Sequence, residues 1–170
     1  MTAKQPTTQM RPPESDWRRI AMDDHFATAA GPWYWRLRDG VPILGMRVDE
    51  RHISVRGACH GGVLMTMADL MSLPASYITG LIDRLVPTMT LSMDFVSPAG
   101  AGDWLEMHTD LLKRTRRTIF AQSVIRARGG DIVARSNAIF RILSEPDPRG
   151  PILHQLLGLE TESRIPKSPN

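Results

Sequence analysis

The chain has 170 residues, of which 42% are hydrophobic and 23% charged, and these values are typical of one globular domain rather than two. Its net charge of +3 is too small to indicate nucleic-acid binding by itself, and it would equally suit a phosphorylated small molecule. The single cysteine, Cys59, excludes an intramolecular disulfide, and no cysteine–histidine spacing typical of zinc occurs, so a reducing, cytoplasmic compartment is expected.

Both ends of the chain are polar and contain prolines. Residues 1–14 are predicted to be a disordered lead and 161–170 a flexible tail, on either side of a single domain from 15 to 160. The lead has no apolar core, so it is not expected to be a signal peptide. Asp69 and several glycines and prolines interrupt the one long apolar run, so no membrane span is expected.

The first predicted elements precede this apolar run. Residues 15–26 favour a short helix with Ser15 or Asp16 as its N-cap. Residues 33–38 and 42–50 favour two strands, and in the second the apolar residues alternate with small or polar ones.

A long helix is predicted over residues 61–79. This segment lacks a two-residue alternation, exceeds the usual length of a strand and stops at Gly80, which suits a helix C-terminus. It is apolar nearly all round, as expected of a buried helix, and Pro74 is expected to bend it.

The remainder of the chain has the pattern of strands. Residues 88–96 alternate strictly, with Met89, Leu91, Met93 and Phe95 on one face and Thr88, Thr90, Ser92 and Asp94 on the other. The dipeptide Gly129-Gly130 predicts a tight hairpin, because both central positions of such a turn favour positive φ. Further strands are predicted over 103–112, 117–128 and 131–143, followed by a small apolar helix over 151–160.

These elements indicate an α+β fold. A single antiparallel sheet must cover one apolar face, and the helix over 61–79 is the only element apolar enough to do so. The sequence therefore predicts an antiparallel sheet wrapped around one long central helix.

One carboxylate, Asp69, lies within this apolar helix. Burial of an ionised carboxylate without partners is costly, so such a group is paired, protonated or lining a cavity. Desolvation would make it a better proton acceptor, which suits a general base. The alternative is that Asp69 shares a narrow exposed stripe with Thr66, three residues earlier on the same face.

The tripeptide His60-Gly61-Gly62 stands where this helix begins. The first N–H groups of a helix have no acceptor within it, and glycines leave these donors sterically open. Together with the positive end of the helix dipole they can bind an anion, or a carbonyl oxygen that is becoming one. The alternative is that the glycines only permit a tight strand-to-helix turn.

Taken as a set, residues 54–69 resemble the active-site segment of the PaaI-type acyl-CoA thioesterases of the hot-dog superfamily. The family pattern is Asn-x-x-Gly-x-x-His-Gly-Gly, followed seven residues later by an aspartate. The later strands are also similar to that family, so the resemblance covers residues 30–143, and the predicted order of elements is the hot-dog order. The residues that match the motif in register are Gly57, His60, Gly61, Gly62 and Asp69.

The resemblance implies a role for each of these residues. Asp69 is the nucleophile or the base that activates water, and the N–H of Gly61 polarises the thioester carbonyl. His60 orients the turn or the substrate, and Thr88 positions water. Ser54 stands where the family has asparagine, so the hydrogen bond that the amide would give is lengthened or lost.

The remaining substrate contacts are assigned to other segments. The basic run at Lys113, Arg114, Arg116 and Arg117 could hold the phosphates of coenzyme A, or it could be a solvated connection. No aromatic residues of the kind that stack on bases surround it, so no nucleic-acid partner is expected.

Three residues around the motif need separate assignments. Gly62 and Met67 are placed among the substrate-binding residues, since methionines can line an adaptable acyl pocket as well as a core. Cys59 is expected to be a buried core residue rather than a nucleophile, because adjacent residues in an extended segment point to opposite faces.

The predicted activity is hydrolysis of an acyl-CoA, or a related pantetheine thioester, to a carboxylic acid and a thiol, without a metal or redox cofactor. The alternative is a non-catalytic acyl-CoA sensor, whereas a hot-dog hydratase resembles a different histidine-plus-acid arrangement. The edges of such a sheet are unpaired, so a symmetric dimer or tetramer is expected. The resemblance implies that each active site takes its acid from one subunit and its His-Gly-Gly turn from the other.

Overall fold

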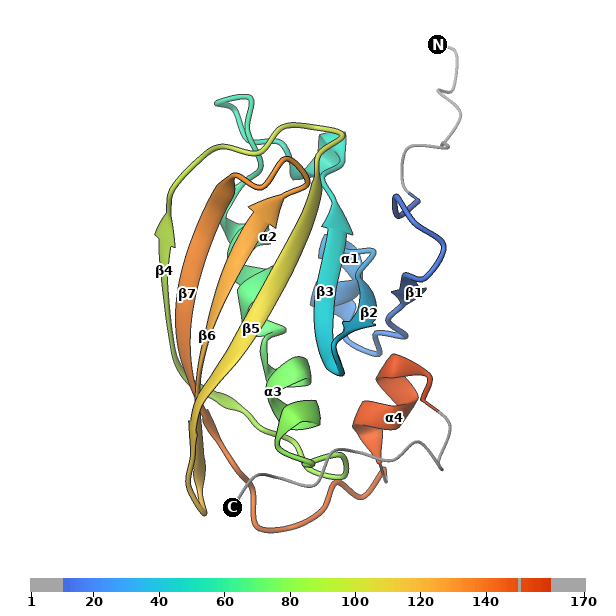
Figure 1. Cartoon of the computed structure of the whole chain (residues 1–170), viewed down its shortest axis with the longest axis vertical. Helices are drawn as coiled ribbons and strands as arrows, with labels where there is room; N and C mark the ends of the chain where they lie inside the picture. The colour runs from blue at the N-terminus through green and yellow to red at the C-terminus, as the bar shows by residue number, and fades with distance from the viewer. Residues whose placement is uncertain (1–10, 150, 160–170) are drawn as a thin grey trace.

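The computed structural model describes residues 11–149 and 151–159. It has an α+β fold in which a curved antiparallel sheet wraps around a helical layer (Figure 1). In chain order the elements are β1 (Arg18–Arg19), α1 (His25–Ala30), β2 (Tyr34–Arg38), β3 (Val41–Arg47), the 3-10 turn η2 (Glu50–His52), α2 (Gly61–Asp69), α3 (Ser72–Ile78), β4 (Thr88–Phe95), β5 (Trp104–Arg114), β6 (Thr118–Ala127), β7 (Ile132–Arg141) and α4 (Ile152–Leu157).

The seven strands lie in the order β1-β2-β3-β5-β6-β7-β4, and every neighbouring pair is antiparallel. The predicted hairpin between β6 and β7 is confirmed, although only Gly130 of its two glycines has a positive φ, of 95°. The sequence did not predict the position of β4, which pairs with β7 and forms one edge of the sheet. In the single chain, one side of β4 therefore remains available for pairing with another strand.

The predicted central helix is confirmed as two pieces, α2 and α3, separated by Leu70 and Met71. The bend was expected at Pro74, but the interruption lies earlier. A proline has no N–H, and its ring collides with the carbonyl four residues before it, which here belongs to Leu70. Pro74 itself lies in the first turn of α3, where a proline is tolerated. The inner face of the sheet packs on these helices, and its fully buried side chains include Leu44, Met46, Leu105, Met107, Ile119, Ile125 and Phe140.

The helix predicted over residues 15–26 is wrong. Trp17 belongs to an extended segment that leads into β1, and α1 begins only at His25, with Asp24 as its N-cap. Trp17 packs edge-on against Trp104 with ring centroids 4.9 Å apart, on the outer face of the sheet. This long-range aromatic contact favours the extended conformation of the segment over a short helix, because short helices are only marginally stable without tertiary packing.

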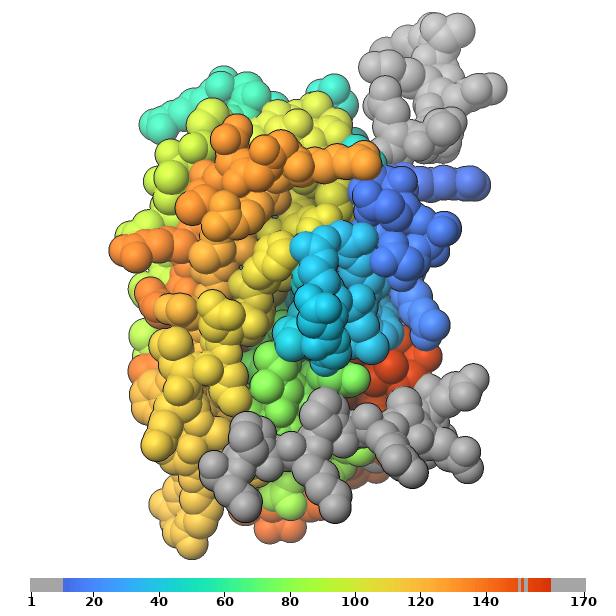
Figure 2. Space-filling view, in the orientation of Figure 1, coloured from blue at the N-terminus to red at the C-terminus, as the bar shows by residue number. Residues whose placement is uncertain are grey.

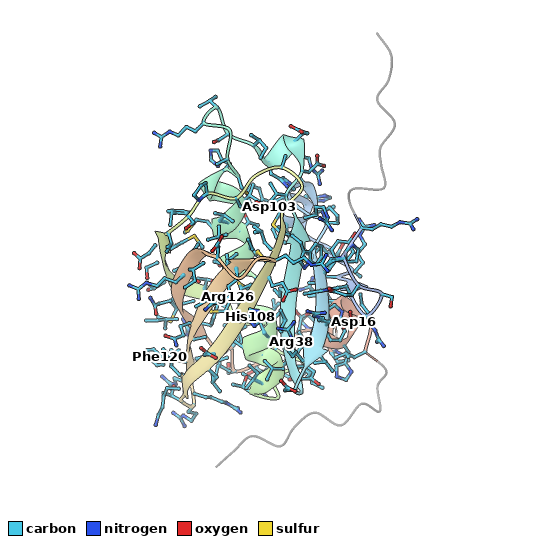
Figure 3. All side chains as sticks on the ribbon, turned by 45° about the horizontal axis from the view of Figure 1, so that its top comes forward. Asp16, Arg38, Asp103, His108, Phe120 and Arg126 are labelled. Carbon is cyan, nitrogen blue, oxygen red and sulfur yellow. The ribbon has the colours of Figure 1, made fainter. Side chains whose placement is uncertain are left out.

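The described part of the N-terminal segment is anchored to the sheet. Glu14, expected in a disordered lead, forms ion pairs with Arg36 and Arg128 at 3.2 Å each. The segment lies beside β2 and β3 (Figure 2), and the outer face of the sheet next to it is polar, with Arg38, His108 and Arg126 projecting from it (Figure 3). The rest of the predicted lead, residues 1–10, and the predicted tail lie outside the described residues.

The predicted C-terminal helix is confirmed as α4. Two backbone hydrogen bonds hold it in place, from the N–H of Leu153 to the carbonyl of Ile82 at 3.2 Å and from the N–H of Ala21 to the carbonyl of Leu156 at 2.9 Å. None of the helices in the described part of the chain is long and apolar enough to cross a membrane.

Candidate active site

The turn that begins α2 leaves one backbone donor open. Nδ1 of His60 accepts the N–H of Gly62 at 2.9 Å, so the side chain caps its own helix. The carbonyl of His60 accepts the N–H of Val63 at 2.9 Å. Within residues 11–149 and 151–159, the N–H of Gly61 contacts no acceptor. Gly61 is therefore the available donor, whereas the N–H of Gly62 is already used.

Gly61 also lies close to an aromatic ring, a contact that the sequence did not reveal. A Cβ atom at Gly61 would lie 3.1 Å from Cζ of Phe95, closer than most side chains tolerate. Phe95 ends β4 and is 57% exposed. Its position at the end of the alternating apolar face is the only signal that could have singled it out.

The His-Gly-Gly turn opens into a cavity of about 830 Å³. Ser54, His60 and Gly61 line it together with Phe95, so these predicted site residues are close in space. The hydroxyl of Ser54 accepts the N–H of Arg56 at 3.3 Å within its own turn.

Asp69 is the last residue of α2, and its side chain is exposed in the single chain. Of the two alternatives that the sequence left open for Asp69, the exposed stripe describes the single chain better than a buried carboxylate. Oδ1 of Asp69 accepts a hydrogen bond from the hydroxyl of Thr88 at 2.7 Å. The hydroxyl of Thr66 is used within the helix, where it donates to the carbonyl of Gly62 at 2.8 Å.

A β-bulge brings Thr88 to Asp69. Strict alternation predicted Thr88 on the face of Thr90, away from the apolar residues of β4. The register instead shifts between Thr88 and Thr90, so that Thr88 lies opposite Phe140, whose side chain is fully buried on the inner face. The extra residue, Met89, becomes 62% exposed. Bulges commonly redirect a side chain next to an active site, and here the redirected group is the hydroxyl that binds Asp69.

The two halves of the predicted site lie at opposite ends of α2. Gly61 and Asp69 are the first and last residues of this helix, which separates them by about 12 Å along its axis. Asp69 and Thr88 line a different cavity, of about 490 Å³, which shares no lining residue with the cavity at Gly61. One thioester carbonyl cannot contact both groups within a single chain.

Known proteins are similar to this chain in sequence and in fold. A model of the thioesterase superfamily matches residues 56–134. The Pseudomonas aeruginosa protein PA0474, whose name describes it as an esterase, is 33% identical over 100 residues, which cover 59% of this chain and 74% of that one. The chain belongs to the PaaI-type hot-dog thioesterases. Acyl-coenzyme A thioesterase 13 of Mus musculus is 31% identical over 81 residues, 46% of this chain and 56% of that one. A variant of the phenylacetic acid degradation protein PaaI from Thermus thermophilus is 26% identical with a TM-score of 0.60, covering 71% and 100% of the two chains.

Membership of the thioesterase superfamily gives the class of activity, which is thioester hydrolysis. Within the described residues, no group of three or more histidine, cysteine, aspartate or glutamate side chains is placed to hold a metal ion.

The residues of the predicted basic run in this thioesterase do not all lie at one site. Arg116 and Arg117 line a groove of about 850 Å³, together with Arg84 and Arg141, which the sequence did not single out. We call this cavity the four-arginine groove. Lys113 is exposed but does not line it, and Nη1 of Arg114 donates to the carbonyl of Thr79 at 2.8 Å, beside the C-terminus of α3.

Two further predictions concern residues near the motif. Met67 was placed among the substrate-binding residues, but it is fully buried in the core, so it cannot contact substrate in this conformation. Cys59 is buried as predicted, and burial raises the pKa of its thiol to about 11. A thiol with so high a pKa is largely protonated near neutral pH and is a poor nucleophile.

Proposed function

We propose that the protein hydrolyses an acyl-CoA, or a related pantetheine thioester, to a carboxylic acid and a free thiol. The observation that carries this proposal is the division of the site. The exposed pair of Asp69 and Thr88 lies at one end of α2, and the open N–H of Gly61 lies at the other. One half offers a base or nucleophile and the other an oxyanion donor, so each supplies what the other lacks.

A two-fold dimer through the edge strand β4 would bring these halves together. Thr88 begins β4 and binds Asp69, whereas Phe95 ends β4 and lies against Gly61. Antiparallel pairing with a second copy would set the start of one β4 opposite the end of the other. Asp69 would then face Gly61 of the partner subunit. The exposed apolar side chains of Met89 and Phe95 support this arrangement, because the pairing would bury them.

In the proposed reaction, the thioester carbonyl oxygen accepts the N–H of Gly61 at the positive end of α2. In one route Asp69 takes a proton from the water that attacks the carbonyl carbon, and the C–S bond breaks as the tetrahedral intermediate collapses. In the other route Asp69 attacks that carbon itself, the C–S bond breaks to leave an anhydride, and water then releases Asp69 and the carboxylic acid. In both routes the leaving thiolate takes up a proton. The hydroxyl of Thr88 holds Oδ1 of Asp69 and leaves Oδ2 for the reaction. The proposed steps use no metal or redox cofactor.

Coenzyme A would extend from this site into the four-arginine groove. The groove and the cavity at Asp69 share Arg84, Leu85 and Leu143, so they are contiguous. Guanidinium groups match phosphate oxygens, and four of them line the groove, although Arg84 already donates to the backbone carbonyls of Leu143 and Ser144. Two acids, Glu145 and Asp147, also line the groove, and Asp147 is engaged by Arg149, whose hydrogen bonds lower the pKa of that carboxyl. A CoA substrate and the free thiol of Cys59 also favour a cytoplasmic location.

One observation favours a second candidate, a non-catalytic acyl-CoA sensor. The side chain of Ser54 is shorter than that of asparagine, and its hydroxyl oxygen accepts the N–H of Arg56 within its own turn, so the hydrogen bond that the asparagine amide of the family would give is lengthened or lost. A protein that retained the cavities but lost this hydrogen bond could bind acyl-CoA without turnover.

The deciding experiment measures free thiol release from a panel of acyl-CoA esters by the full-length protein and by Asp69→Asn. We expect release by the wild type and none by the variant, because an amide neither attacks nor accepts a proton near neutral pH. The exposed position of Asp69 argues against loss of fold as the cause, and a thermal melt of the variant checks this. Tight binding without release on any ester would favour the sensor, and near wild-type release by the variant would exclude Asp69 as the reacting group.

A further inference from the structure

The cavity of about 490 Å³ that begins at Asp69 continues into the protein between three elements. One wall is formed by the end of α2 and one face of α3: Asp69 ends α2, and in α3 Ser76 lies three residues after Leu73 and four after Ser72. The segment that leads into β4 forms the second wall, with Leu81 and Val86. The third wall is α4, which packs beside α3 (Figure 1) and contributes Leu153 and Leu156.

We propose that this cavity is the acyl subsite and that it takes an aliphatic acyl chain of medium length, with α4 closing its far end. The inference rests on the proposed function and names the substrate class of the same site. With the thioester carbon at Asp69, the chain would follow the helical face toward α4. From Asp69 to Ser76 the helical layer rises about 10 Å, the length of an extended chain of about eight carbons.

The chemistry of the lining distinguishes an acyl chain from the nucleotide end of coenzyme A. Eight of its fourteen lining residues are aliphatic or proline: Leu73, Leu81, Leu85, Val86, Pro87, Leu143, Leu153 and Leu156. Its charged members are the carboxylates of Asp24 and Asp69 and the guanidinium of Arg84, and two carboxylates would repel a phosphate. The phosphates are better accommodated in the adjoining four-arginine groove.

Burial and backbone hydrogen bonds fix the position of the wall formed by α4, so this wall can limit the length of the acyl chain. Leu153 is almost fully buried, and its N–H is bonded to the loop after α3. The carbonyl of Leu156 is bonded to Ala21, in the segment that precedes α1. Both α4 and Ala21 lie outside residues 56–134, so this wall is built by parts of the chain that the family model does not cover.

The test varies the size of the side chain at Leu156, which is only half-buried, and compares saturated acyl-CoA esters from two to twelve carbons. We expect Leu156→Trp to lower kcat/KM for the eight-carbon ester at least tenfold while lowering it less than twofold for the acetyl ester. Leu156→Ala should move the preferred length upward. The matched control is Gln155→Trp, an exposed neighbour on the same helix that does not line the cavity, for which we expect an unchanged length profile.

Binding of non-hydrolysable S-alkyl-CoA thioethers separates failure of this inference from failure of the proposed function. If no ester is hydrolysed but Leu156→Trp weakens binding of the S-octyl and not the S-ethyl compound, the acyl subsite stands and the hydrolase does not. If the wild type is active but Leu156→Trp affects all lengths equally, or Gln155→Trp shifts the profile as strongly, the subsite assignment is overturned.

Discussion

At the scale of single residues, Thr88 and Asp69 form one unit joined by a 2.7 Å hydrogen bond. The carboxylate is exposed, so its orientation depends on this bond rather than on close packing. Gly61 is constrained in a different way, by the nearby ring of Phe95 and by the need for an open N–H. These residues therefore make separable contributions, which single substitutions can measure.

Replacement of Thr88 by alanine should lower kcat about tenfold to a hundredfold and leave the fold intact, because the hydroxyl positions a group that remains present. Steady-state thiol release measures the effect. Thr90→Ala is the matched control, since Thr90 is an exposed threonine of the same strand that pairs opposite Ile139. Equal losses of kcat in the two variants would mean that Thr88→Ala acts by disturbing the strand and not by removing the hydroxyl that binds Asp69.

Replacement of both Arg116 and Arg117 by alanine should raise KM for CoA esters several-fold and leave kcat little changed. A pantetheine thioester without the nucleotide should be unaffected, because it has no phosphates to lose contact with. Lys113→Ala is the control, an exposed cation near the same hairpin that does not line the four-arginine groove. Equal effects on both esters would contradict the assignment.

Cys59 should react with an aromatic disulfide reagent about a hundredfold more slowly than an ordinary thiol, because a pKa of about 11 in place of 9.0 reduces the thiolate fraction by that factor. Burial slows it further. Absorbance during titration of native and denatured protein measures this, with one equivalent expected only after denaturation. Rapid reaction in the native protein would show that the turn before α2 opens.

At the scale of elements, the decisive feature is the bulge in β4. It changes which face Thr88 occupies without altering the strand on either side, because the pairing with β7 resumes in register from Thr90 to Phe95. The interruption between α2 and α3 is a second irregularity, and it follows Asp69 directly. Both irregularities therefore lie beside the carboxylate.

Deletion of Met89 should remove the bulge and make Thr88 the direct neighbour of Thr90, so that Thr88 stays on the inner face opposite Phe140 in regular pairing. We expect a smaller loss of kcat than in Thr88→Ala, because the hydroxyl stays on the same face while the segment before it is shifted by one residue. Met89→Ala keeps the extra residue and serves as the control, with activity close to that of the wild type. A loss of kcat as large as that of Thr88→Ala would show that the bulge itself is needed to position the hydroxyl.

At the scale of the whole molecule, the proposed site needs two copies of the chain, because Gly61 and Asp69 lie at opposite ends of α2. Complementation tests this directly with Asp69→Asn, which lacks the acid, and Gly61→Pro, which lacks the open N–H. Each variant alone should be inactive. A mixture should recover about a quarter of wild-type activity after co-refolding, because about half the dimers are mixed and each of these has one intact site of two.

The control for this mixture is Gly61→Ala, which keeps the N–H but adds the same Cβ contact with Phe95. It should retain much more activity than Gly61→Pro, since the exposed Phe95 ring can shift by a few tenths of an ångström. No recovery despite confirmed mixed dimers would place Asp69 and Gly61 in the site of one subunit.

The sequence by itself determined the elements whose signals are local. Alternation located most of the strands, the apolar run from Gly61 located the central helix, and the spacing of His60, Gly61 and Asp69 identified the motif. The sequence could not show where long-range contacts outweigh the local preference of a segment for helix or strand. Trp17 lies in an extended segment because it packs on Trp104. Pairing with β7 places β4 at the edge of the sheet and its bulge at Met89. Arg84 and Arg141, far apart along the chain, meet in one groove only because the sheet brings their segments together. Local propensity differs by fractions of a kcal/mol per residue, so tertiary packing decides such cases.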